Sequence, residues 1–155
     1  MGRSFRPDAD HTHLETADRP LRRNAENEHF CLELGRTLGL PVANSEVTRF
    51  KDEIAIVIER YDRVHAGKVW HRVHQEDMCR ALSIPPKQKY QSDGGPGVRD
   101  IVDLLRIFSS NPKEDIGTFL DAVYYNWRVA GTDAHAKNYA LLLAAAGQVR
   151  FAPLI

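Results

Sequence analysis

An acidic, a basic and an amide residue stand close together near the end of the sequence: Asp133, Lys137 and Asn138. A carboxylate can accept the proton of an attacking hydroxyl group, and an amide oxygen can bind a Mg²⁺ ion that bridges phosphate groups. A neighbouring lysine can offset the negative charge of a phosphoryl group during its transfer. These residue types at this spacing indicate phosphoryl transfer as the candidate chemistry.

The offset of five residues between Asp133 and Asn138 equals that between the catalytic Asp and the metal-binding Asn of a protein-kinase catalytic loop. The offset alone is also compatible with a structural role, because Asp and Asn favour turns for purely local reasons. In that interpretation Asp133 and Asn138 cap a turn and Lys137 is solvated. The surrounding sequence favours the catalytic interpretation.

The stretch Gly131–Asn138 resembles the catalytic loop of the HipA-type serine/threonine kinases, the toxins of bacterial toxin–antitoxin modules. Three further blocks resemble the same family in the same order, and the four together extend over residues 24–154. The three blocks are Glu28–Cys31, Glu59–Arg63 and His74–Gly97. The resemblance implies a protein serine/threonine kinase, and hence a transferase.

Within the catalytic loop, the resemblance implies that Asp133 is the catalytic base and that Asn138 is the metal ligand. It also implies that His135 and Lys137 line the phosphate side of the site. In kinases, the helix near the start of the chain carries an acid that pairs with a phosphate-binding lysine. Glu26 or Glu28 could play this part, and a helix-capping charge is the alternative.

A run of five apolar residues leads into a short polar link made of Glu59, Arg60, Tyr61 and Asp62. A buried strand followed by such a link provides the backbone hydrogen-bonding groups that an adenine ring requires. By resemblance, the backbone of Glu59 and Tyr61 binds adenine and Asp62 lies near the ribose. The alternative is that Asp62 and Arg63 form an ion pair in a turn and that Tyr61 belongs to the core.

The family implies ATP and Mg²⁺ as cofactors, a protein substrate with a Ser or Thr hydroxyl that acts in translation, and a HipB-like DNA-binding antitoxin as partner. The 21 basic and 21 acidic residues cancel, so we expect no direct nucleic-acid binding. No apolar run approaches the roughly 20 residues that cross a bilayer, and the first residues lack an apolar signal core. We therefore expect a cytoplasmic protein without membrane contact, with Cys31 and Cys79 as buried free thiols.

The sequence predicts an α+β fold, part of a protein-kinase-like HipA fold. Residues 1–23 show no period and are expected to be extended or poorly ordered. Residues 24–62 are expected to form the remnant of a small β-rich lobe with the hinge. Residues 63–155 are expected to form part of a mainly helical lobe, with the catalytic loop at 131–139 followed by a β-hairpin.

Local patterns predict helices over 25–38, 75–82, 98–108 and 112–127, and strands over 42–50, 53–59 and 67–73. The hairpin is expected over 139–143 and 148–151. The first helix should bury Phe30, Leu34 and Leu38. The last helix should bury Ile116, Phe119, Leu120, Val123, Tyr124 and Trp127.

Some parts of a complete HipA-type kinase are absent or altered. His13–Thr16 falls where the family has a strand ending in the ATP lysine, and it contains no lysine. Phe151–Ile155 stops just before the family's Tyr-Asp, whose Asp binds Mg²⁺. The sequence therefore predicts a kinase truncated at both ends and inactive alone.

Two other functions compete with the kinase. One is a non-catalytic pseudokinase remnant that binds an antitoxin or another partner. The other is a metal hydrolase that uses Asp133 and His135, which is disfavoured because no second His or acid stands at ligand spacing on the same element.

Overall fold

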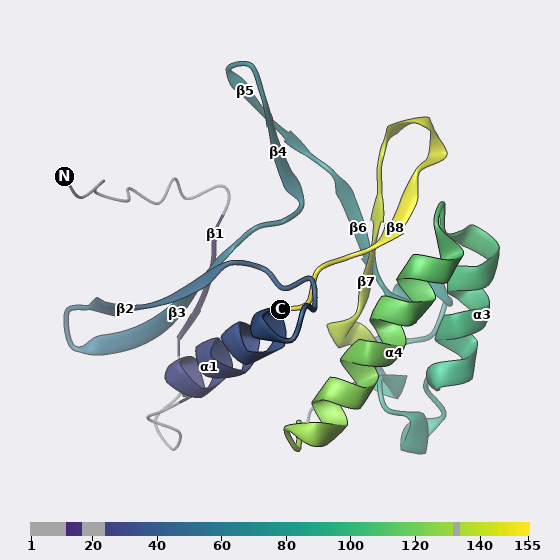
Figure 1. Cartoon of the computed structure of the whole chain (residues 1–155), viewed down its shortest axis with the longest axis horizontal. Helices are drawn as coiled ribbons and strands as arrows, with labels where there is room; N and C mark the ends of the chain where they lie inside the picture. Colours follow the sequence, from purple (N-terminus) through teal and green to yellow (C-terminus); the bar gives the residue numbers. More distant parts are fainter. Residues whose placement is uncertain (1–11, 17–23, 132–133) are drawn as a thin grey trace.

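The apolar run of the sequence forms the central strand of the first sheet, β3 (Glu53–Glu59), in a computed structural model that describes residues 12–16, 24–131 and 134–155. Strands β1 (Thr12–Thr16) and β2 (Ser45–Phe50) pair with it in antiparallel register, in the order β1-β3-β2. Helix α1 (Asn24–Thr37) packs against this sheet (Figure 1). The resulting first core consists of Ala25, Leu32, Ala43, Ile56 and Ile58.

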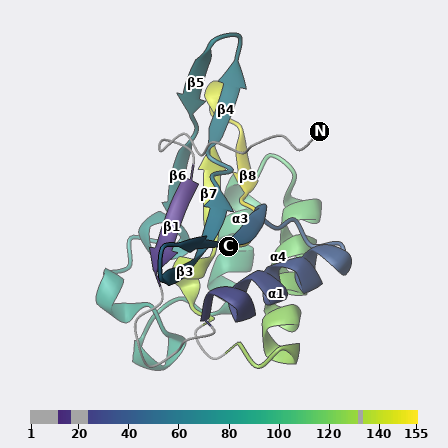
Figure 2. The ribbon, with the colours of Figure 1, turned by 90° about the vertical axis from the view of Figure 1, so that its left-hand side faces the viewer.

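A second sheet is the hairpin of β4 (Arg63–Ala66) and β5 (Val69–Arg72). Gly67 closes its turn with φ of +69°, a conformation that glycine adopts without steric cost. Figures 1 and 2 show this hairpin projecting away from the helices. The sequence predicted one strand over 67–73, so the first strand of the hairpin was missed.

The third sheet joins β6 (His74–Asp77), β7 (Ala140–Leu143) and β8 (Val149–Phe151), with β7 in the middle. The predicted hairpin after the catalytic loop is confirmed by the pairing of β7 with β8. The predicted helix over 75–82 is wrong at its start, because β6 pairs with β7. Helix α2 (Met78–Ala81) begins only after Asp77, whose Oδ1 accepts a hydrogen bond of 2.9 Å from the Arg80 backbone N–H.

Two long helices pack beside this sheet: α3 (Val98–Phe108) and α4 (Pro112–Arg128) (Figure 1). Short 3₁₀ turns also occur in the described ranges: η1 (Pro86–Gln88), η2 (Gln91–Asp93), η3 (Ala136–Asn138) and η4 (Ala145–Gly147). The second core gathers residues of α2, α3, α4, β7 and β8 and of the segment before β7, among them Met78, Cys79, Ile101, Leu105, Phe119, Ala122, Tyr139, Leu141 and Phe151. No helix in the described ranges is long and apolar enough to cross a membrane.

The predicted buried face of α4 is confirmed in part. Phe119 is buried, and Ile116 and Val123 are partly buried against the second core, whereas Leu120, Tyr124 and Trp127 are 43%, 61% and 71% exposed. Asp115 and Ala122, which were not predicted to be buried, are buried. In α1 the prediction also fails in part, since the structure buries Ala25, Leu32 and Gly35 and exposes Phe30 and Leu38.

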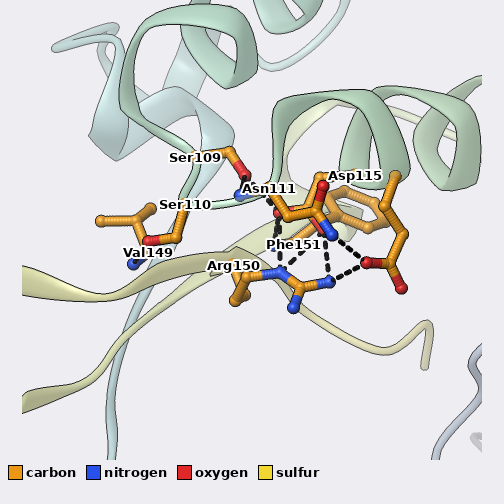
Figure 3. A network of polar contacts seen from close by, with 8 residues as sticks. Ser109, Ser110, Asn111, Asp115, Val149, Arg150 and Phe151 are labelled. Carbon is orange, nitrogen blue, oxygen red and sulfur yellow. Dashed lines mark hydrogen bonds and ion pairs between the residues drawn. The ribbon is translucent and has the colours of Figure 1, made fainter.

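Figure 3 shows the polar network around Asp115. Its Oδ2 accepts hydrogen bonds from Ser109 Oγ at 2.6 Å and from the Phe151 backbone N–H at 2.9 Å. The Arg150 guanidinium lies against the same carboxylate, with Nε 3.0 Å from Oδ1. These contacts join the α3–α4 turn to β8 and hold the helices against the sheet that follows the catalytic loop.

The two cores meet at the last residues of the chain. The backbone N–H of Ala43 donates to the Leu154 carbonyl, and the Leu154 N–H donates to the Pro41 carbonyl, both at 2.9 Å. Because residues 41–43 make these contacts, the strand predicted over 42–50 begins only at Ser45. Both cysteines are free thiols, Cys79 buried and Cys31 half-buried.

Candidate functional site

The link after β3 lines a cavity of about 210 Å³, here called the hinge cavity. Glu59, Arg60, Tyr61 and Asp62 all line it, together with Ile58, Gln75 and Ile155. Glu59 is fixed at the strand end, because its N–H donates to the Asn44 carbonyl at 2.8 Å and its carboxylate accepts from Asn44 Nδ2 at 2.6 Å.

Asp62 is a buried carboxylate surrounded by arginines. Its oxygens accept hydrogen bonds from Arg60 Nε at 2.9 Å and from Arg63 Nη1 at 2.8 Å, and Arg72 Nε lies at 3.7 Å. Burial raises the pKa of this carboxyl, but the hydrogen bond and charge of Arg60, with Arg63 and Arg72, outweigh burial and hold the pKa below its ordinary value. Asp62 therefore ties the link to the start of β4, and its contact with a ribose stays a prediction.

Tyr61 packs against the first core. Burial, followed by the charge of Asp62, raises the pKa of Tyr61 to about 12. The phenol is therefore neutral near neutral pH, and a hydrogen bond joins it to Gln75 of β6. The Tyr61 side chain therefore anchors the link to the first core and to β6.

Replacing Asp62 by asparagine should lower the free energy of unfolding by about 1–2 kcal/mol at pH 7, because bonds to charged groups are lost. The folded pKa of Asp62 lies below its ordinary value of 3.8, so the stabilisation is complete above that pH and is lost as the pH falls below it. Urea unfolding at pH 7 and pH 3 should show the difference between the two proteins shrinking in acid. Asp52→Asn, in an exposed turn, is the control; an Asp62→Asn effect that persists at pH 3 would contradict the ion-pair account.

Asn138 of the predicted catalytic loop lines a larger cavity of about 400 Å³, here called the α1 cavity. Glu28 of α1 lines the same cavity, whereas Glu26 does not, and the role of either as the acid that pairs with a lysine stays a prediction. Asp133 lies outside the described residues. Gly131 and Ala134, the described residues before and after it, both line the α1 cavity.

The α1 cavity and the hinge cavity are neighbours, because Ile155 lines both. Ligand pockets commonly have volumes of about 300–1,000 Å³. The α1 cavity alone falls within that range at about 400 Å³. Ile155 is the lining residue that the two cavities have in common.

His135 and Lys137 do not line the α1 cavity. The His135 ring packs edge-on against Tyr90, with ring centroids 5.1 Å apart. It lines a different cavity, of about 240 Å³, together with residues of α3 and α4. Lys137 is exposed and lines none of the three cavities. The expected role of both residues on the phosphate side stays a prediction.

The candidate metal ligand Asn138 suits Mg²⁺ better than a metal ion whose ligands all come from the protein. Among the described residues, no three His, Cys, Asp or Glu side chains lie close enough to hold a metal. Mg²⁺ prefers oxygen ligands, and in nucleotide sites it takes one or two of them from the protein and the rest from phosphates and water. The amide oxygen of Asn138 fits that requirement.

Two contacts that support the site were not found from the sequence. Asn126 Nδ2 donates to Tyr139 Oη at 2.8 Å, which ties the end of α4 to the end of the catalytic loop. Tyr125 Oη donates to the Cys31 carbonyl at 2.5 Å, which ties α4 to α1. The sequence carries no signal for these contacts, which depend on how the two parts pack.

A family model and two curated relatives match most of this chain. The family described as "HipA-like C-terminal domain" matches residues 7–154. A putative kinase, Y4mE, of Sinorhizobium fredii is 44% identical over 130 residues, which are 83% of this chain and 31% of that protein. The serine/threonine-protein kinase toxin HipA of Shewanella oneidensis is 30% identical over 133 residues, which are 78% of this chain and 31% of the toxin.

Two solved structures share the fold. Shewanella oneidensis HipA, in a complex with HipB and operator DNA, superposes with a TM-score of 0.78 at 25% identity, covering 93% of this chain and 36% of that one. The Helicobacter pylori proinflammatory kinase CtkA superposes with a TM-score of 0.60 at 17% identity, covering 92% of this chain and 47% of that one. The fold and the site thus define part of a kinase-like protein.

The chain belongs to the HipA-like C-terminal domain family. The family and the kinase-like fold that were predicted from the sequence are therefore confirmed. The chain spans about a third of the length of the curated relatives that it matches.

Proposed function

We propose that this chain supplies the adenine-binding link and the catalytic loop of a HipA-like, ATP-dependent serine/threonine protein kinase. One observation supports the proposal: the link at Glu59–Asp62 and the loop residue Asn138 line two cavities that share Ile155 in their walls. Adenine would bind the backbone of Glu59 and Tyr61, and the phosphates would extend toward Asn138.

In the proposed reaction, the oxygen of a Ser or Thr hydroxyl attacks the γ-phosphorus of ATP. A P–O bond to the acceptor forms, the bond between the γ-phosphorus and the β,γ-bridging oxygen breaks, and ADP leaves. Asp133 takes the proton of the hydroxyl group. Asn138 would hold Mg²⁺, which neutralises phosphate charge when it is bound.

The described residues that line the α1 cavity include no lysine and no arginine to offset the charge of the phosphates. Strand β1, where the resemblance predicts the ATP lysine, has the sequence Thr-His-Leu-Glu-Thr. Losing a single such contact costs on the order of 10²–10³ in rate. We therefore propose that the chain alone binds ATP. We also propose that its rate of phosphate transfer is too low to measure.

The same lack of lysine favours a second candidate, a pseudokinase remnant that binds a partner without catalysis. The related HipA of Shewanella oneidensis is known in a complex with HipB and operator DNA. We propose a HipB-like antitoxin as the partner in either case. Co-expression with such an antitoxin and co-purification would support the partner; separate elution would contradict it.

A titration with ATP, with and without Mg²⁺, separates the two candidates. Binding to the folded state raises the melting temperature by mass action, so the nucleotide-binding account predicts a rise at millimolar Mg²⁺ and ATP. No rise would contradict ATP binding and favour the remnant. Asp133-dependent transfer of radiolabelled phosphate at an appreciable rate would contradict the proposed inactivity of the chain alone.

A further inference from the structure

Asn44 holds Glu59, the first residue of the link, by two contacts. The Asn44 carbonyl accepts a hydrogen bond from the Glu59 N–H at 2.8 Å, and Asn44 Nδ2 donates to Glu59 Oε2 at 2.6 Å. The first contact extends the pairing of β2 with β3 one step beyond the pair Ser45 and Ile58. Because both the backbone and the side chain of Glu59 are held, the direction of its own carbonyl group is restricted.

The side-chain amide of Asn44 lies between a cation and an anion. Arg36 Nη1 of α1 donates to Asn44 Oδ1 at 2.5 Å, and Arg36 Nη2 donates to the Ala43 carbonyl at 2.9 Å. A guanidinium only donates hydrogen bonds, and a carboxylate only accepts them. The amide satisfies both neighbours in one orientation, with its oxygen toward Arg36 and its NH₂ group toward Glu59. A carboxylate at position 44 would instead face the carboxylate of Glu59.

Two consecutive residues, Ala43 and Asn44, hold two parts of the wall of the hinge cavity. The Ala43 N–H donates to the Leu154 carbonyl at 2.9 Å, whereas Asn44 holds Glu59. Glu59 and Ile155, the residue after Leu154, both line the hinge cavity. Asn44 is not among the described residues that line this cavity. It therefore acts on a ligand there through Glu59.

These polar contacts lie near the surface. Asn44 and Glu59 are exposed residues. Arg36 Nε lies 3.2 Å from Glu33 Oε1, and the side chains of this pair are 37% and 45% exposed. Exposed polar contacts of this kind contribute little to the free energy of unfolding. A change of the Asn44 side chain should therefore alter the placement of Glu59 without unfolding the chain.

We propose that Asn44, oriented by Arg36, is a positioning residue that fixes the Glu59 carbonyl so that the link distinguishes an amino purine from an oxo purine. The proposal rests on the proposed function, in which adenine binds the backbone of Glu59 and Tyr61. A carbonyl oxygen accepts hydrogen bonds and cannot donate them. The Glu59 carbonyl therefore accepts from the exocyclic amino group of adenine, whereas the oxo group of hypoxanthine meets it as a second acceptor.

Asn44→Asp tests the proposal, because it keeps the size of the side chain and places a like charge against Glu59. The probes are ATP and inosine triphosphate, each titrated with Mg²⁺ in a calorimeter; both carry the same phosphates, so the ratio of their affinities reports the base. The wild-type chain should bind ATP about tenfold or more tightly, because the oxo base loses a hydrogen bond and leaves acceptors unpaired. Asn44→Asp should reduce this ratio about threefold or more, since the two carboxylates move apart and shift Glu59.

The double variant Asn44→Asp/Glu59→Gln is the rescue. The new glutamine amide can donate to the new aspartate, which restores the hydrogen bond with donor and acceptor exchanged. The ratio of affinities should return toward that of the wild type. Asn111→Asp is the matched control, because Asn111 Nδ2 donates to Glu114 Oε2 in a similar exposed pair at the start of α4. This control should leave the ratio unchanged.

Each other outcome overturns a defined part of the account. If the wild-type chain prefers ATP and Asn44→Asp keeps the ratio, or weakens both nucleotides equally, Asn44 does not position the link while the proposed function stands. A rescue variant that leaves the ratio low shows that the effect does not pass through Glu59, which also contradicts the positioning role. Equal binding of both nucleotides by the wild type contradicts base recognition by the Glu59 carbonyl. If the wild type binds neither nucleotide, the proposed function fails, and the positioning role fails with it.

Discussion

Asp115→Ala should lower the free energy of unfolding by about 3 kcal/mol, a large part of the total for a domain of this size. The change leaves Ser109 Oγ and the Phe151 N–H without their acceptor (Figure 3). Both groups belong to buried residues, so lost hydrogen bonds there cost more than at the surface. Arg150 is 43% exposed and can regain water, which keeps the cost below that of a fully buried pair.

Asp103→Ala is the matched control, because Asp103 pairs with Arg99 and Arg106 on the exposed side of α3. Exposed ion pairs contribute little, so this variant should stay within about 0.5 kcal/mol of the wild type. Chemical unfolding followed by circular dichroism measures both. Equal losses for the two variants would show that the Asp115 network does not hold α4 against β8.

Asn138→Ala should weaken ATP binding on the order of 10–100-fold when Mg²⁺ is present, the range for disturbed metal ligation. ATP binding without Mg²⁺ should change little, because the amide oxygen acts through the metal. Isothermal titration calorimetry with and without Mg²⁺ measures this difference. Asn138→Asp, which keeps an oxygen ligand, should restore part of the metal-dependent affinity.

Asn27→Ala is the matched control for this effect. Asn27 carries the same amide group and lines the same cavity from α1. It should leave the metal dependence unchanged, since the proposed ligand is Asn138. Equal weakening by both variants, or weakening that does not depend on Mg²⁺, would contradict the role of Asn138 as metal ligand.

The sequence predicts best where one local pattern decides the structure. The run Ile54–Ile58 lies within β3, the predicted helix over 98–108 is α3, and the hairpin after the catalytic loop is β7–β8. Strand β6 was predicted as helix, because its pairing with β7 joins segments that lie far apart in the sequence. Such a pairing outweighs local preference and leaves no local signal.

The sequence predicted which residues belong to the candidate site but not how they are arranged in space. The link at Glu59–Asp62 and the residue Asn138 follow from short motifs, whereas the presence of Glu28 and Asn138 in the wall of one cavity depends on the packing of α1 against α4. His135 lies against Tyr90 and outside the wall of the α1 cavity, and the spacing of the loop residues gives no sign of this contact. The burial of Asp115 was missed because an acidic residue on an inward face is not expected from helical periodicity.

Nuclear magnetic resonance with a non-hydrolysable ATP analogue and Mn²⁺ in place of Mg²⁺ tests most directly whether one nucleotide joins the link to the loop. The account predicts that the analogue alone shifts the amide signal of Tyr61. It predicts that added Mn²⁺ then broadens the signals of Asn138 and Glu28 more strongly than those of the β4–β5 hairpin. An unshifted Tyr61 signal, or broadening centred away from Asn138, would contradict the shared nucleotide site.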